Sequence, residues 1–106
     1  MIFHLTFTAD WVAGVAAGEY RLSTRGRSLD EVGFIHCSFE NQVNRVATSL
    51  FAGTSELVLL TIDPARGRAE IRHENLDGGD ELFPHIYGPL NLDAVVEVKR
   101  YEPKSS

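Results

Sequence analysis

The stretch ELVLLTID, residues 56–63, most constrains the fold, because it is apolar at consecutive positions. Side chains alternate between the two faces of a strand, so a strand with one wet face would show a polar residue at every second position. Both faces of this segment must therefore be covered by the rest of the chain, which makes it a central strand. A chain of 106 residues can build one core around it but not two. We expect a single domain over residues 1–102 and a flexible tail over residues 103–106.

Other segments supply the partners of this central strand. Two helices are expected: a short one that Thr8 caps and Gly18 ends, and a longer one over residues 39–52 with apolar side chains on one side. The short helix carries an apolar stripe of Trp11, Val12, Val15 and Ala16. Further strands are expected at Ile2–Phe7, Phe34–Cys37, residues 69–75, Phe83–Tyr87 and Ala94–Tyr101.

The connections between these elements are polar. Residues 19–32 read as an arginine-bearing loop, in which Ser28 and Glu31 have the spacing of a capping box and predict one helical turn. The element order β-α-β-α-β-β-β-β is typical of an α+β fold. We therefore expect a small bent or split, mainly antiparallel sheet with two flanking helices.

Charge and cysteine content exclude several classes of protein. Fifteen acidic against ten basic residues give a net charge of −5, which argues against broad nucleic-acid binding. Cys37 is the only cysteine, so an internal disulfide and a cysteine-built metal site are excluded. The sequence shows no secretory leader and no apolar run of membrane-spanning length, and we expect a cytoplasmic protein without a membrane partner.

Three of the four histidines lie inside strand-like segments that are apolar or aromatic. Each shares a strand face with polar or aromatic side chains: His4 with Thr6, His36 with Phe34 and Ser38, and His85 with Phe83 and Tyr87. If these faces converge, the three imidazoles line one pocket, with Cys37 buried behind it as a small apolar residue. A hydrogen-bonded structural role is the alternative for each histidine. His73 and the pair Arg72 and Glu74, which we interpret as a same-face ion pair, belong to a charged surface stretch.

The motifs resemble those of a known family. An opening FHLT, a Trp in the first helix, GEYRLS, SLDEVGFIHCS, LVLLTID, IRHE and FPHIYGPLNLDAVV occur in the order seen in the domain-of-unknown-function 952 family of bacteria and plants. The resemblance covers residues 2–101. It implies an architecture similar to that of the ADP-ribosyltransferase superfamily, which binds NAD in a cleft between two small sheets.

The resemblance also implies roles for individual residues. His4 matches the first-strand residue that contacts the adenosine ribose, His36 matches the residue beside the nicotinamide, and His85 stands where the superfamily commonly has Glu. Thr6, Tyr20, Ser38 and Tyr87 complete the expected cofactor site. Arg21, Arg25 or Arg27 would meet phosphates.

His85 in place of a glutamate bears on the chemistry. A neutral imidazole does not stabilise an oxocarbenium-like ribose as a carboxylate does. Histidines instead suit nucleotide binding, or acid–base catalysis on a phosphoryl or glycosidic bond, because imidazole titrates near neutral pH. We therefore expect an NAD- or ADP-ribose-binding, transferase-like enzyme with His36 and His85 as catalytic residues. The ligand would be nucleotide-like, and an RNA end stays open as a substrate.

Two alternatives stay open. One is a non-catalytic module that binds a ligand or a partner. The other is a three-histidine zinc site, although the wide spacing of the histidines carries no motif information and no metal is expected. The sequence does not indicate an oligomeric state.

Overall fold

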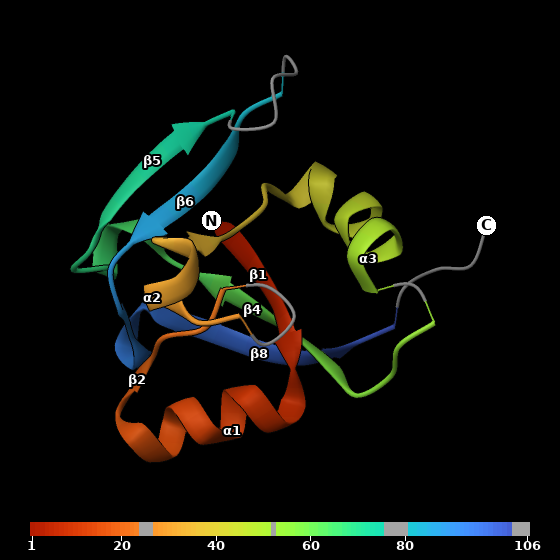
Figure 1. Ribbon diagram of the computed structural model, residues 1–106, viewed down its shortest axis with the longest axis horizontal. Coiled ribbons are helices and arrows are strands. Elements are labelled where there is room, and N and C mark those ends of the chain that lie inside the picture. The colour runs from red at the N-terminus through yellow and green to blue at the C-terminus, as the bar shows by residue number, and fades with distance from the viewer. Residues whose placement is uncertain (24–26, 52, 76–80, 103–106) are drawn as a thin grey trace.

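The computed structural model describes residues 1–23, 27–51, 53–75 and 81–102. Arg25, the glycine-rich loop at 77–80 and the expected tail at 103–106 lie outside these ranges. Within them, the chain forms three small antiparallel sheets with few helices (Figure 1). The expected α+β class is therefore confirmed. No helix among the described residues is both long and apolar enough to cross a membrane.

The largest sheet is built around the segment that the sequence marks as central. Strand β4 (Leu57–Ile62) pairs on one side with β1 (Ile2–Phe7) and on the other with β8 (Val95–Tyr101). Leu57 and Leu60 are fully buried, and they come from opposite faces of β4. Both faces of β4 are therefore covered by the rest of the protein, as its consecutive apolar residues predict.

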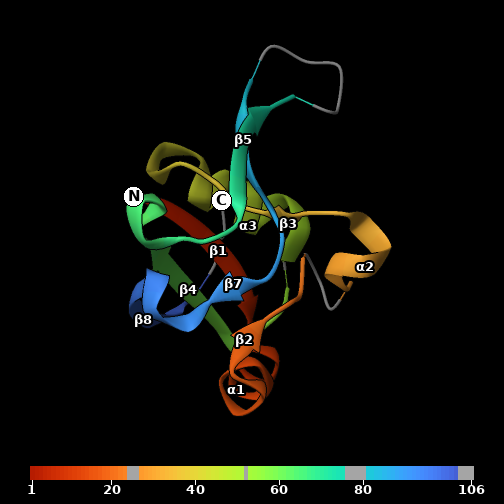
Figure 2. The ribbon, with the colours of Figure 1, turned by 90° about the vertical axis from the view of Figure 1, so that its left-hand side faces the viewer.

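Two further sheets complete the fold. One has the order β3 (Ile35–His36), β6 (Phe83–Tyr87) and β5 (Glu70–Glu74), and the other is a short pair of β2 (Glu19–Tyr20) and β7 (Leu90–Asn91). The sequence did not predict the short pair, because two-residue strands leave no alternation to recognise. The first helix lies at one end of the molecule and the β5–β6 hairpin at the other (Figure 1 and Figure 2).

The helical segments are α1 (Thr8–Ala17), α2 (Leu29–Val32) and α3 (Val43–Phe51), with 3₁₀ turns η1 (Glu40–Gln42), η2 (Pro64–Arg66) and η3 (Leu92–Ala94). The expected capping box starts α2, where the Ser28 hydroxyl accepts from the backbone N–H of Glu31 at 3.1 Å. The longer expected helix is divided into η1 and α3.

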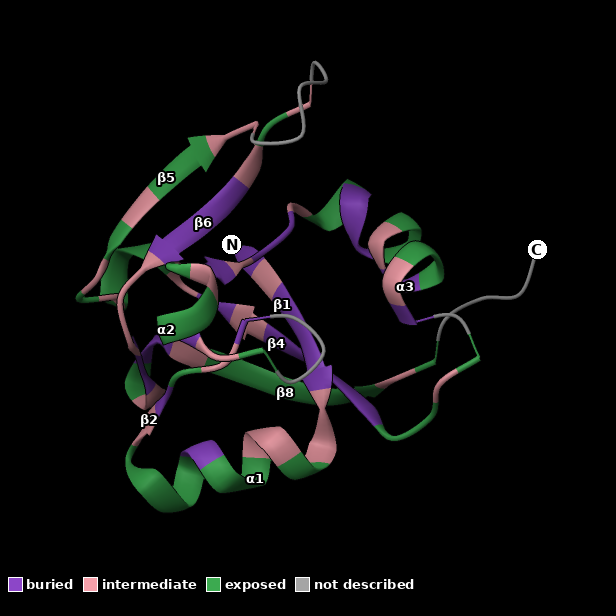
Figure 3. Ribbon diagram, viewed as in Figure 1, coloured by how far each residue is buried: buried purple, intermediate pink, exposed green. Residues whose placement is uncertain are grey.

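The core consists of two clusters, one on each face of the β1–β4–β8 sheet. Strand β4 is buried along most of its length, whereas β8 is largely exposed (Figure 3). Helix α3 covers one face, where Val43, Ala47 and Phe51 pack on Leu5, Leu57 and Leu59. The other face packs on the inner side of the β3–β6–β5 sheet through side chains that include Leu60, Ile62, Ile35 and Ile86. The two small sheets therefore stack with a shared apolar layer.

Helix α1 differs from its sequence-based description. Val12 and Val15 of the expected apolar stripe are 59% and 49% exposed, while Gly14 is the buried residue of the helix. Thr8 does not cap the helix, because its hydroxyl donates to the backbone carbonyl of Glu56 at 2.9 Å. Trp11 of the stripe does pack against the core beside Tyr20, but the rest of the stripe was wrong because the helix turns its glycine, rather than its valines, toward that ring.

Gly14→Ala is expected to destabilise the protein by about 1–3 kcal/mol, although alanine favours a helix. A Cβ atom at this position would lie 2.9 Å from Cδ1 of Tyr20, whose ring is fully buried. Chemical denaturation measures the effect, and Ala13→Gly on the exposed side of α1 reports helix propensity alone. A Gly14→Ala protein more stable than wild type would show that the Tyr20 ring yields freely.

Candidate functional site

The outer face of the β3–β6–β5 sheet carries two histidines together with aromatic and charged side chains. In the strand register, His36 of β3 and Arg72 of β5 lie opposite His85 of the central strand β6. Residues at alternate positions point the same way, so this face collects side chains from all three strands. We call it the histidine face, and its members are Phe34, His36, Glu70, Arg72, Glu74, Phe83, His85 and Tyr87.

Two imidazoles lie side by side on this face, inside a layer of aromatic rings. The ring centroids of His36 and His85 are 5.4 Å apart. Phe34 stacks on the His85 ring at 4.1 Å, and Phe83 lies 5.2 Å from the His36 ring. His85 is only 3% exposed, whereas His36 is half-buried. His36 is therefore the more accessible of the two rings.

A carboxylate holds the buried histidine. Glu74 Oε1 lies 3.0 Å from His85 Nδ1 and also accepts a short hydrogen bond from the Tyr87 hydroxyl. The bonds from Tyr87 and His85 lower the pKa of Glu74, and the carboxylate in turn raises the pKa of Tyr87. Because an ionised carboxylate only accepts, His85 Nδ1 carries a proton toward it. Since Nδ1 is engaged by Glu74, Nε2 is the ring nitrogen through which His85 could exchange a proton with a ligand.

Arg72 is engaged differently from the ion pair expected with Glu74. Its Nη2 donates to Glu70 at 3.0 Å, and its guanidinium lies 4.5 Å from the centroid of the Tyr87 ring. The two residues share a strand face as expected, but the ion pair does not form, because Glu74 is bound across the sheet by two side chains of β6. A cation thus covers the tyrosine end of the histidine face.

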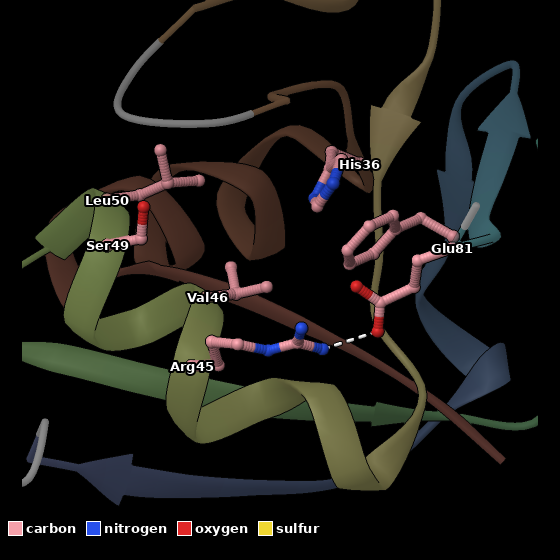
Figure 4. A pocket seen from close by; sticks show the side chains of 7 residues that line it. His36, Arg45, Val46, Ser49, Leu50 and Glu81 are labelled. Atoms are coloured by element: carbon pink, nitrogen blue, oxygen red, sulfur yellow. Dashed lines mark hydrogen bonds and ion pairs between the residues drawn. The ribbon is translucent and has the colours of Figure 1, made fainter. Parts of the chain in front are cut away.

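A small cavity lies between the histidine face and helix α3 (Figure 4). Arg45 and Val46 from α3 face His36 and Glu81 across it, and Arg45 forms an ion pair with Glu81. Gln42 supports this ion pair by donating to Glu81 at 3.0 Å. The cavity measures about 210 Å³ and is completed by Ser49, Leu50 and Phe83. Its polar groups are thus an imidazole, a hydroxyl and the ion-paired guanidinium and carboxylate of Arg45 and Glu81.

His4 does not join the other two histidines. It is 2% exposed, its Nδ1 donates to the backbone carbonyl of His36 at 2.7 Å, and its Nε2 lies 3.0 Å from the Tyr20 hydroxyl. That hydroxyl lies 2.6 Å from Thr6 Oγ1. Burial lowers the pKa of His4 to about 4 and raises the pKa of Tyr20. The expected pocket of three imidazoles is therefore not formed: His4, Thr6 and Tyr20 are a buried network beneath the β3 backbone.

The remaining expected site residues have other surroundings. Ser38 is 4% exposed, and its backbone pairs with that of Phe3. Cys37 is buried as expected, and burial raises the pKa of its thiol. Arg21 is exposed and bonded to Glu19 and Asp30. Tyr87 is the one expected cofactor-binding residue that lies on the histidine face.

The zinc alternative lacks its third ligand. Within residues 1–23, 27–51, 53–75 and 81–102, no three side chains of His, Cys, Asp or Glu are placed to hold a metal ion. The reason is that both ring nitrogens of His4 are engaged in the interior, away from the face that carries His36 and His85.

Comparison with known proteins identifies the family. The model of the family described as "Protein of unknown function (DUF952)" matches residues 5–98, and the chain belongs to this family. The fold is similar to the crystal structure of CC0527 from Caulobacter crescentus, with 30% sequence identity and a TM-score of 0.81 over 93% of this chain and 83% of that one.

Two further CC0527 structures agree with this comparison. A crystal structure of a double mutant has a TM-score of 0.80 at 30% identity, covering 93% of this chain and 83% of that one. The solution structure has a TM-score of 0.74 at 32% identity, covering 93% and 82%. A search among curated proteins finds no match.

Sequence reasoning missed the partners of the two histidines. Glu74 lies in a charged stretch that reads as surface, Arg45 lies on the polar side of an expected helix, and Glu81 directly follows an expected loop. The available signal was the alternation of residues 69–75, which places Glu74 and Arg72 on one face of a strand. Only the antiparallel register with β6 shows that this face is the one that carries His85.

Proposed function

We propose that the histidine face is the site of an acid–base enzyme that acts on a phosphoryl or glycosidic bond of a nucleotide-like ligand. The observation that carries the proposal is the pair of imidazoles with centroids 5.4 Å apart, one of them held by a carboxylate. Two adjacent imidazoles can serve one reaction as proton donor and proton acceptor. His85 is the ring oriented by Glu74, and His36 is its more accessible partner.

The size of the cavity limits which part of a ligand it takes. Sites for drug-sized ligands span roughly 300–1,000 Å³. The cavity beside His36 measures about 210 Å³, which suits a phosphate or a ribose rather than a whole dinucleotide. Arg45 at its rim would contribute a guanidinium to an anionic group, exchanging its bond to Glu81 for the ligand. The aromatic rings of the face offer stacking surface to a base.

The resemblance to the ADP-ribosyltransferase superfamily suggests NAD or an ADP-ribose compound as the ligand class. In this proposal His36 and His85 keep their catalytic roles, and Tyr87 remains a contact residue. His4, Thr6 and Tyr20 leave the ligand site because they bond to one another beneath the β3 backbone, and Ser38 leaves it because its segment pairs with Phe3 of β1. The proposal also includes an architecture like that of the ADP-ribosyltransferases, a cytoplasmic location and a nucleotide-like partner.

A non-catalytic ligand-binding module is the second candidate. The observation that favours it is the burial of His85, which is 3% exposed beneath the Phe34 ring. A catalytic His85 requires Phe34 to move away from the imidazole, whereas a structural His85 does not. The two candidates therefore differ in whether bound ligand is chemically changed.

A melting screen with NAD, ADP-ribose, inorganic phosphate and zinc tests the proposal, with product analysis by chromatography for each compound. A ligand that binds only the native state at a hundred times its Kd stabilises it by about 2.7 kcal/mol. We expect NAD or ADP-ribose to raise the melting temperature of wild type but not of His36→Gln. His73→Gln, on the opposite face of β5, is the matched control.

The outcomes separate the candidates. Stabilisation with turnover supports the enzyme, and stabilisation without turnover supports the binding module. Stabilisation by zinc alone, or an equal response of wild type and His36→Gln, would exclude nucleotide binding at the histidine face.

A further inference from the structure

The outer edge of the β1–β4–β8 sheet is open. Strand β8 pairs with β4 on one side, and no strand of the described residues pairs with its other side. Residues 96–100 are all exposed, and Val96 and Val98 are 43% and 41% accessible. An open edge of seven residues presents unpaired backbone N–H and C=O groups to another strand.

The charged side chains of β8 restrict which strand could pair with its open edge. Glu97 and Lys99 lie two residues apart on the same strand face, and neither forms an ion pair with another described residue. Their partners on β4 are the uncharged Thr61, opposite Glu97, and Leu59, opposite Lys99. This differs from β5, an edge strand of another sheet, where Arg72 is already paired with Glu70.

A second copy of β8 supplies the complementary charges. Two identical antiparallel strands related by a twofold axis pair around one residue that faces itself. Pairing centred on Val98 places Glu97 opposite Lys99 of the other copy, twice. Centring on Glu97, Lys99 or Arg100 instead places like charges opposite each other, which is destabilising.

We propose that β8 is a homodimer interface, in which two copies pair antiparallel around Val98 and join two three-stranded sheets into one. The open edge supplies the backbone partners, Val98 faces Val98, and the Glu97–Lys99 pairs fix the register. The inference is independent of the proposed enzymatic function, because β8 carries no residue of the histidine face.

Charge reversal tests the interface by sedimentation velocity over a concentration series that reaches about 1 mM. Glu97→Lys or Lys99→Glu should weaken the dimer by at least about tenfold, since each places two like-charge pairs across the axis. The double variant Glu97→Lys/Lys99→Glu should restore it. Glu40→Lys, with the same charge change outside β8, should have little effect. A wild-type monomer throughout the series, or a double variant no tighter than the single ones, would overturn the proposal.

Disulfide trapping tests the register directly. Val98→Cys should cross-link two copies under mild oxidation, because residues that face each other in an antiparallel pair lie within disulfide reach. Val96→Cys is the matched control: it is equally exposed on the same strand face, but its two copies would be about 13 Å apart. Cys37 is buried and does not compete. Equal cross-linking of both variants would exclude pairing around Val98.

Discussion

His85→Gln is expected to lower turnover of the nucleotide-like substrate by on the order of a hundredfold or more while the protein stays folded. The amide of glutamine can still donate a hydrogen bond to Glu74, but it does not titrate and cannot exchange a proton with a ligand. The rate is measured with the compound whose consumption the product analysis detects. His73→Gln on the opposite face of β5 controls for the loss of an imidazole.

The choice of glutamine rather than alanine follows from the burial of this ring. His85 is 3% exposed and stacks on Phe34, so His85→Ala leaves both a void and an unpaired Glu74. We expect that loss to cost about 1–3 kcal/mol of stability in addition to any loss of activity. A His85→Gln protein with wild-type turnover would end the catalytic assignment and leave His85 with a structural role.

Glu74→Gln separates the effect of the negative charge beside His85 from the effect of the hydrogen bonds that Glu74 accepts. The amide oxygen still accepts from Tyr87 and His85, so the fold is expected to persist. The negative charge that stabilises a protonated imidazole is lost, and we expect turnover to fall by at least about tenfold. Turnover equal to that of wild type would show that the carboxylate only positions the ring.

The alternation of strands made part of this site predictable from sequence. His36 and His85 share a face with Phe34, Phe83 and Tyr87 because side-chain direction in a strand is a local property. Their pairing across β3 and β6 then follows from the register. Local pattern does not say which strand faces are covered by other elements. It therefore could not distinguish the outer face of β6 from the inner face of β1.

His4 shows why the rest was not predictable. Its alternation with Phe3 and Leu5 correctly separates it from the side chains that pack toward α3. The opposite face of β1 is nevertheless buried, because the inner side of the β3–β6–β5 sheet covers it. Its hydrogen-bond partner Tyr20 comes from a polar stretch that gave no sign of a strand. Glu74 was hidden in the same way, since its role depends on β6.

The buried position of His4 predicts an acid-sensitive fold. Burial holds the pKa of His4 at about 4, against 6.5 for an unperturbed histidine. Between these two pH values the unfolded chain binds a proton that the native protein does not. Stability therefore rises with pH through this interval and is lost as the pH falls. The difference corresponds to about 3 kcal/mol of unfolding free energy between pH 6.5 and pH 4.

Urea denaturation at a series of pH values measures this loss, and His4→Gln isolates it. The variant is expected to be less stable than wild type at pH 7, because glutamine reproduces only part of the bonding to His36 and Tyr20. Its stability should fall less steeply between pH 6.5 and pH 5, since the titrating group is gone. Glu74 and Glu81, whose pKa values are lowered, lose their contribution at lower pH in both proteins. Parallel stability curves for wild type and His4→Gln across that interval would contradict a buried, neutral His4.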